Sequence, residues 1–79
     1  MLAEIKSLSS LKKYIETSRL PVRIKMGETQ LSINYLPFLE EPFIADIYEG
    51  SETIHYRNYK TKDKMIEEII EIFRDFTFN

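Results

Sequence analysis

The side chains suited to catalysis are few in this chain. His55 is the single histidine among 79 residues, and there is no cysteine. In the sheet predicted below, Asp46 lies opposite His55, and Ser32 lies on the same face. A serine, a histidine and an aspartate can together activate a hydroxyl nucleophile. An open sheet face, however, has no water-excluded pocket and no converging N–H groups to stabilise an oxyanion. We therefore expect no catalytic residues, no cofactor and no enzyme activity.

Acidic side chains form the strongest pattern. Between Phe38 and His55 the chain carries neither Lys nor Arg but has five acids, which are Glu40, Glu41, Asp46, Glu49 and Glu52. They lack the alternating ligands and central glycine of a calcium-binding loop, and a site that used His55 would have only carboxylates as further ligands. We expect no metal site. The segment is either a solvated edge or a surface that attracts a basic partner.

The rest of the chain alternates in charge. Residues 1–37 hold six basic side chains against three acids, and residues 56–65 hold four against one. Residues 66–79 hold four acids against one basic side chain. The net charge of −2 therefore hides blocks of roughly +3, −5, +3 and −3. Such separation influences which partners approach the protein, not which fold it forms.

The longest predicted connection, residues 36–42, is a second candidate for binding. Two prolines bracket Phe38 and Leu39, which stand beside Glu40 and Glu41. Loops supported by a rigid sheet often carry binding residues. The two apolar side chains either anchor a partner or tuck under the loop to extend a small core, and the sequence favours neither.

The elements that would position these side chains begin with a helix. Leu8, Leu11 and Ile15 recur at helical spacing, with Ile5 one turn earlier, and Ser7 is a suitable N-cap. The helix should end before the proline at position 21, because proline disfavours helical geometry at the preceding residue.

Two hairpins are expected next. The first turns at Gly27, which stands first of two turn residues, as a type II′ turn requires. Its alternating apolar residues share one face, with Met26 opposite Thr29, Ile24 opposite Leu31 and Val22 opposite Ile33. The second hairpin turns at Gly50 and predicts an inner face that pairs Ile47 with Ile54, Ala45 with Tyr56 and Phe43 with Asn58.

The outer face of the second hairpin has the composition of a possible interface. The same register pairs Asp46 with His55, Ile44 with Arg57 and Tyr48 with Thr53. With Tyr59, this face would expose Ile44, Tyr48, His55 and Arg57. Tyrosine and arginine are enriched at protein interfaces, but an antiparallel sheet also often leaves one face in contact with water.

A second helix completes the layout. Thr61 is its expected N-cap, with Asp63 in its first turn. Its apolar stripe spans an arc of about 160° and comprises Met65, Ile66, Ile69, Ile70, Ile72, Phe73 and Phe76. The order of helix, four-stranded antiparallel meander and helix predicts a two-layer α+β fold, with residues 1–79 as a single domain. No apolar run fits a signal peptide or a membrane span, so we expect a cytoplasmic protein.

Three lysines near the start of the last predicted helix suggest an alternative function. The element order and Lys60, Lys62 and Lys64 resemble a double-stranded RNA-binding domain, which would imply contacts from these lysines to phosphates. The acidic helix would repel the same phosphates. Nucleic-acid binding through Lys60–Lys64 and the tyrosine-bearing sheet face is therefore the alternative.

The element order and the acidic character also resemble those of small phage-encoded inhibitors of host defence enzymes, among them anti-CRISPR proteins. This resemblance implies a non-enzymatic protein-binding module that inhibits a host protein. The charge pattern implies that the partner has a basic surface. No membrane partner is expected, and the oligomeric state stays open. The acidic segment and its apolar neighbours supply the expected partner-binding residues, which are Phe38, Leu39, Glu40, Glu41, Asp46, Tyr48, Glu49 and Glu52.

Overall fold

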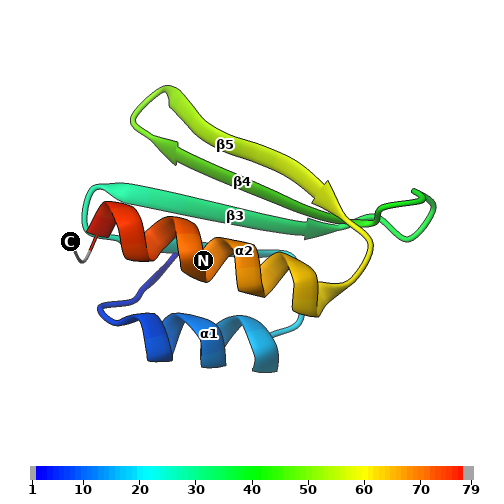
Figure 1. Cartoon of the computed structure of the whole chain (residues 1–79), viewed down its shortest axis with the longest axis horizontal. Coiled ribbons are helices and arrows are strands. Elements are labelled where there is room, and N and C mark those ends of the chain that lie inside the picture. Colours follow the sequence, from blue (N-terminus) through cyan, green and yellow to red (C-terminus); the bar gives the residue numbers. More distant parts are fainter. Residues whose placement is uncertain (1, 78–79) are drawn as a thin grey trace.

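The computed structural model describes residues 2–77, which form a sheet covered on one face by helices (Figure 1). In chain order the elements are β1 (Leu2–Glu4), α1 (Leu8–Thr17), β2 (Val22–Met26), β3 (Thr29–Tyr35), β4 (Phe43–Glu49), β5 (Glu52–Tyr59) and α2 (Lys62–Thr77). Within this part of the chain the five strands neighbour one another in sequence order. We call the face that packs against both helices the inner face and the opposite one the outer face. The predicted α+β class is confirmed, with one strand more than expected.

The first hairpin matches its prediction. β2 and β3 pair antiparallel in the expected register, and their inward side chains are buried in the core; the pairs are Val22 with Ile33, Ile24 with Leu31 and Met26 with Thr29. Gly27 has a φ of 61°, whereas the second turn residue, Glu28, keeps a negative φ. A positive φ at the first central position alone is the signature of a type II′ turn.

The second hairpin departs from its predicted register close to the turn. Tyr48 lies opposite Thr53, as expected, but Ile47 lies opposite His55, so Ile54 is an extra residue in β5. Ile54 still packs partly against the core. An extra residue of this kind is a β-bulge, and it turns every later side chain of the strand to the other face.

The bulge reverses the predicted faces of β5. The predicted pair of Asp46 with His55 is wrong, and so is the predicted outward placement of His55, Arg57 and Tyr59. These three side chains lie on the inner face, while Tyr56 and Asn58 lie on the outer one. The observed pairs are Phe43 with Tyr59, Ile44 with Asn58, Ala45 with Arg57, and Asp46 with Tyr56.

The chemistry of two neighbouring residues accounts for the shift. A uniform ladder would bury Asn58 opposite Phe43, and burying an unbonded amide is costly. With the bulge, Asn58 lies on the outer face, where its Nδ2 donates to the carbonyl of Glu41 at 3.1 Å. Tyr59 takes the inner position and is only 3% exposed. Its aromatic ring supplies the apolar area that Asn58 lacks.

The predicted layout lacks β1. This strand pairs in parallel with β2, so that Ala3 lies opposite Ile24. The amide N–H of Ile5 extends the pairing by donating to the carbonyl of Lys25 at 3.0 Å. The four strands that were predicted as an antiparallel meander are therefore part of a five-stranded mixed sheet within the described residues. A strand of three residues is too short to show a period of two in the sequence.

Both helices begin as predicted and bury their predicted stripes. The Ser7 hydroxyl accepts from the N–H of Ser10 at 3.2 Å, and the Thr61 hydroxyl accepts from the N–H of Lys64 at 3.2 Å. From α1, Leu11 and Ile15 are fully buried. From α2, the buried side chains are Met65, Ile66, Ile69 and Phe73, with Ile70 and Ile72 partly buried. The side chain of Phe76 lies outside the described part of the chain.

Candidate functional site

The loop between β3 and β4, residues 36–42, holds the most exposed large apolar side chain of the described residues. Phe38 is 79% exposed. The loop itself is restrained by backbone hydrogen bonds, because the N–H of Leu36 donates to the Pro42 carbonyl at 2.9 Å and the N–H of Leu39 donates to the Leu36 carbonyl at 3.1 Å. The side chain of Asn58 adds a bond to the same loop. An aromatic ring thus projects from a fixed backbone.

The two apolar residues of the loop differ in their exposure. Leu39 and Leu36 are partly buried, whereas Phe38 is not. The sequence left two alternatives for this pair, an anchor or an extension of the core. Leu39 does not belong to the hydrophobic core cluster, so both alternatives stay predictions for this pair.

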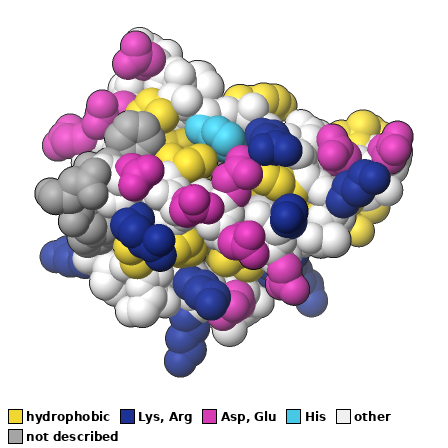
Figure 2. All heavy atoms as spheres, viewed as in Figure 1, with side chains coloured by type: hydrophobic (Ala, Val, Ile, Leu, Met, Phe, Trp, Pro, Cys, Tyr) yellow, Lys and Arg dark blue, Asp and Glu magenta, His cyan; other side chains and the backbone are white. Residues whose placement is uncertain are grey.

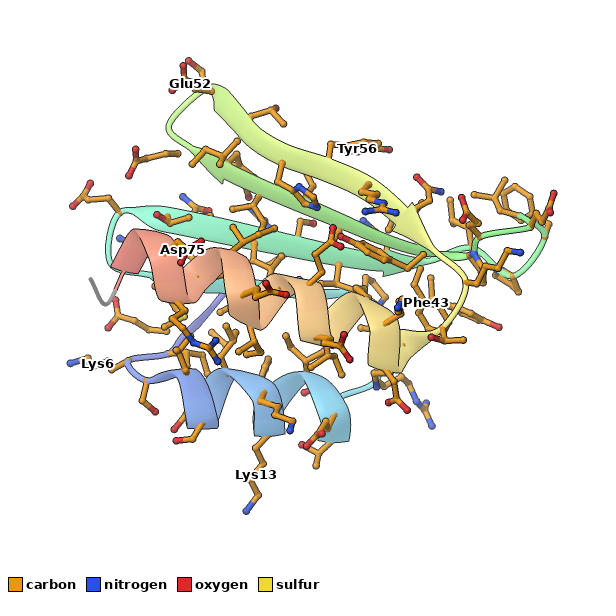
Figure 3. All side chains as sticks on the ribbon, viewed as in Figure 1. Lys6, Lys13, Phe43, Glu52, Tyr56 and Asp75 are labelled. Atoms are coloured by element: carbon orange, nitrogen blue, oxygen red, sulfur yellow. The ribbon has the colours of Figure 1, made fainter. Side chains whose placement is uncertain are left out.

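Four of the five acids predicted as one surface are divided between two ends of the sheet. Glu40 and Glu41 are exposed in the loop beside Phe38, whereas Glu49 and Glu52 flank the turn between β4 and β5. β4 has seven residues, so the two ends lie roughly 20 Å apart at a rise of about 3.4 Å per residue. Figure 3 shows this separation, with Glu52 at the hairpin tip and Phe43, where β4 begins, at the opposite end.

Asp46 and Tyr48 lie between these ends, on the outer face. Asp46 lies opposite Ser32 and Tyr56, and its Oδ1 is buried without a hydrogen-bond partner among the described residues. The Tyr48 hydroxyl donates to Gln30 Oε1 at 3.2 Å. Both side chains are therefore set into the sheet surface and are not brought together with the loop.

The outer face is less apolar than the sequence suggested. Ile44 belongs to it but is only 8% exposed, so it adds little surface for a partner. Tyr56, at 61%, is the prominent aromatic side chain of this face and points away from the helices in Figure 3. Ser32 and Asp46 share this face, whereas His55 lies on the inner one. The sheet thus separates the three members of the Ser–His–Asp arrangement considered above.

A polar cluster of four side chains joins the inner face of β5 to α2. The Tyr59 hydroxyl donates to Glu68 Oε1 at 2.6 Å, and Arg57 Nη1 donates to both carboxylate oxygens at 3.1 and 3.2 Å. His55 Nε2 lies 2.9 Å from the Tyr59 hydroxyl and 3.6 Å from Glu68 Oε1. Since the hydroxyl gives its one proton to Glu68, the hydrogen between His55 and Tyr59 must belong to Nε2.

The cluster perturbs the pKa of two of its members. The hydrogen bond from Tyr59 lowers the pKa of Glu68, and the nearby charge of Arg57 adds to this effect. Burial raises the pKa of Tyr59, as do its hydrogen bond to Glu68 and the negative charge of that carboxylate. Arg57 also lies over the Tyr59 ring, with Cζ 5.3 Å from the ring centroid. These contacts hold the edge strand against α2, and the cluster is best described as structural.

Sequence reasoning missed this cluster because it placed β5 in the wrong register. A usable signal existed in the composition of the strand. Tyr59 and Phe43 are large apolar partners, whereas Asn58 is a poor one, and this difference favours the shifted register. Glu68 then becomes the natural acceptor for a buried hydroxyl.

The lysines of the alternative nucleic-acid surface do not form a common patch with the tyrosines. Lys62 Nζ donates to the carbonyls of Glu16 and Ser18 at 3.4 and 3.3 Å and so ties α2 to the end of α1. Lys60 and Lys64 are exposed near the start of α2. The predicted tyrosine face is divided, since Tyr48 lies on the outer face and Tyr59 is buried on the inner one.

Metal binding finds no support within the described residues. No group of three or more His, Asp and Glu side chains in this part of the chain is placed to hold a metal ion. Nor does any helix within residues 2–77 have the length and apolar character needed to cross a membrane.

Comparisons of the chain with protein families, curated proteins and solved structures yield no match.

Proposed function

We propose that this chain is a protein-binding module that docks through residues 36–42, with Phe38 as its apolar anchor. The observation that carries the proposal is the 79% exposure of Phe38 on a loop fixed by hydrogen bonds. A loop backbone that is already restrained loses little conformational freedom on binding. Buried aromatic anchors of this kind often dominate the binding energy of an interface.

The charge beside the anchor indicates the kind of partner. Glu40 and Glu41 are both exposed next to Phe38, so the complementary surface would be an apolar pocket bordered by Lys or Arg. Charges at the edge of an interface mainly speed association, whereas buried anchors slow dissociation. In its narrower form the proposal is that the partner is a host protein with a basic surface, which the chain inhibits as phage-encoded inhibitors do.

The proposed surface is smaller than the one expected from the sequence. Glu49 and Glu52 lie at the far end of β4, and Asp46 and Tyr48 are set into the outer face. These four residues are therefore left out of the docking surface. Glu49 and Glu52 supply a natural control for Glu40 and Glu41, because they are the same type of residue at the other end of the sheet.

Affinity capture from a host lysate followed by quantitative mass spectrometry tests the proposal. The parent chain, Phe38→Ala and the matched aromatic variant Tyr56→Ala are compared as baits. We expect the partner to be lost from Phe38→Ala alone. Loss from Tyr56→Ala with retention by Phe38→Ala would instead place the docking surface on the outer face.

Binding kinetics with the identified partner separate the two contributions. Phe38→Ala should raise the dissociation rate, at a cost of about 2 kcal/mol or more. Glu40→Lys with Glu41→Lys should lower the association rate and flatten its salt dependence. The control is Glu49→Lys with Glu52→Lys, which makes the same change in charge at the other end of the sheet. Equal effects of the two charge reversals would contradict a docking site at the loop.

A further inference from the structure

The two helices leave a groove between them on the side away from the sheet. α1 and α2 run in opposite directions (Figure 1), and Lys62 joins the start of α2 to the end of α1. The groove has a volume of about 540 Å³, and its aliphatic lining comes from Ile66 and Ile70 of α2. Ile70 is only partly buried. Ile66 is buried, so Ile70 is the part of the apolar floor that the chain's own side chains leave partly exposed.

Carboxylates outnumber cations along the rim of this groove. The cations are Lys12 and Arg74, and the acids are Glu16, Asp63, Glu67 and Glu71. All six side chains are exposed, and none of the four acids forms a salt bridge with another described side chain. Figure 2 shows Asp and Glu side chains gathered over α2 on this face. The rim thus carries two uncompensated negative charges close to an apolar floor.

The α2 side of the groove has the spacing of a helical docking stripe. Asp63, Ile66, Glu67, Ile70 and Glu71 recur at intervals of three and four residues, so they lie along one side of the helix. A third helix can pack into the furrow between two antiparallel helices by the usual fit of ridges into grooves. α1 has ten residues, so a partner helix of about ten residues, roughly 15 Å long, would match its length.

We propose that this groove binds a basic amphipathic helix of a partner protein. Aliphatic side chains of that helix would pack on Ile70, the partly exposed residue of the floor, and flanking lysines or arginines would meet the acids of the rim. Helix-in-groove recognition of this type reads apolar side chains at helical spacing, and the excess of carboxylates selects a basic helix over an acidic one. The inference is independent of the docking loop, because the two surfaces share no residue.

Two designed peptides test the proposal on the whole chain. Both have about 14 residues, near the length at which an isolated helix becomes marginally stable, and both carry leucines at the same helical spacing. The first peptide has lysine at all the remaining positions, and the second peptide has glutamate at those positions. ¹⁵N-labelled protein is titrated with each peptide at about 0.15 M salt, where long-range attraction between exposed charges is largely screened. We expect the lysine peptide alone to shift the amide signals of residues 12–16 and 63–74.

Charge reversal identifies where the peptide binds. The double variant Glu67→Lys, Glu71→Lys should bind the lysine peptide with an affinity lower by about tenfold or more, which corresponds to about 1.4 kcal/mol. Glu49→Lys with Glu52→Lys makes the same change in charge on the distant hairpin turn and should leave binding within about twofold. All four positions are exposed, and thermal melting confirms that each variant is folded.

Three results would overturn the inference. The first is a set of shifted signals that lies outside the two helices. The second is equal binding of the glutamate peptide, which would remove the role of charge. The third is an equal loss of affinity in both double variants, which would show that only the overall charge of the chain matters. Variants of Phe38 leave this experiment unaffected, so its failure is distinct from failure of the docking loop.

Discussion

Replacing Tyr59 with phenylalanine removes one hydroxyl group and leaves the aromatic ring in the core. That hydroxyl donates to Glu68 at 2.6 Å and accepts from His55 at 2.9 Å. A hydrogen bond to a charged group contributes about 1.5–3 kcal/mol, and one between neutral groups about 0.5–1.5 kcal/mol. The Glu68 side chain is 33% exposed and keeps its contact with Arg57, so solvent and Arg57 recover part of the loss. We expect Tyr59→Phe to lower the free energy of unfolding by about 2 kcal/mol.

Thermal and urea denaturation measure this loss. For a domain of this size, about 2 kcal/mol corresponds to a fall of roughly 10 °C in Tm. The urea m-value should stay unchanged, because the variant exposes the same surface on unfolding. Tyr56→Phe is the matched control, since Tyr56 lies on the same strand, is 61% exposed and faces away from α2. Its stability should stay within about 0.5 kcal/mol of the parent.

A double-mutant cycle with Glu68→Ala, which leaves no acceptor for the hydroxyl, assigns the loss to the contact itself. The hydroxyl and the carboxylate should show a coupling energy of about 1 kcal/mol or more. If Tyr59→Phe melts with the parent, or if the two substitutions are additive, the contact does not stabilise the fold. The account of why β5 adopts the shifted register would then lose its energetic basis.

Four further outcomes follow from the packing and the charges. Phe73 is fully buried, so Phe73→Ala should cost about 3–5 kcal/mol, and a melting curve equal to that of the parent would contradict its place in the core. Glu49 lies directly opposite Glu52, so Glu52→Lys should raise the free energy of unfolding by about 0.2–1 kcal/mol, as measured in urea. The lowered pKa of Glu68 stabilises the fold above the unfolded pKa near 4.5, and urea midpoints should fall as the pH drops through the folded pKa. The raised pKa of Tyr59 stabilises the fold up to the unfolded pKa near 10, so urea midpoints should fall as the pH rises beyond that value. Tyr59→Phe has no hydroxyl to titrate and should lack this contribution to the fall.

The elements that the sequence predicts well are those determined by local signals. The first hairpin combines a glycine in the first turn position with strict alternation from Val22 to Met26, and both signals agree on one register. The helices likewise carry their caps, Ser7 and Thr61, next to their apolar stripes. Local choices that agree with one another and with the overall fold are the usual mark of a well-specified element.

The features that the sequence does not predict depend on distant partners. β1 is stabilised by its pairing with β2 and has only three residues of its own. The bulge at Ile54 is favoured by Tyr59, whose hydroxyl needs an acceptor that comes from α2. A register deduced from the turn alone cannot include such a contact, because it involves a residue nine positions further along the chain.

The candidate site was only partly predictable for a similar reason. Composition singles out Phe38, Leu39 and the two acids beside them, but it does not say which apolar side chain turns inward. That choice depends on how the loop closes, through the bond from Leu36 to Pro42 and the bond from Asn58 to Glu41. The second of these bonds exists only in the shifted register, because the bulge places Asn58 on the outer face.

The exposed ring of Phe38 contrasts with the way the chain shields its edge strand. β5 has eight residues and lies at the edge of the described sheet, where unpaired backbone groups invite association with another strand. A bulge and inward-pointing charged side chains both discourage such pairing, and β5 has both, since Ile54 interrupts its ladder and Arg57 turns toward α2. One shift of register thus brings Tyr59 into the core and also protects the edge. Among the described residues, no comparable shielding covers Phe38, although its aromatic ring is more apolar than the backbone edge of β5. This contrast between a protected sheet edge and an exposed aromatic ring on a restrained loop supports the proposal that a partner buries Phe38.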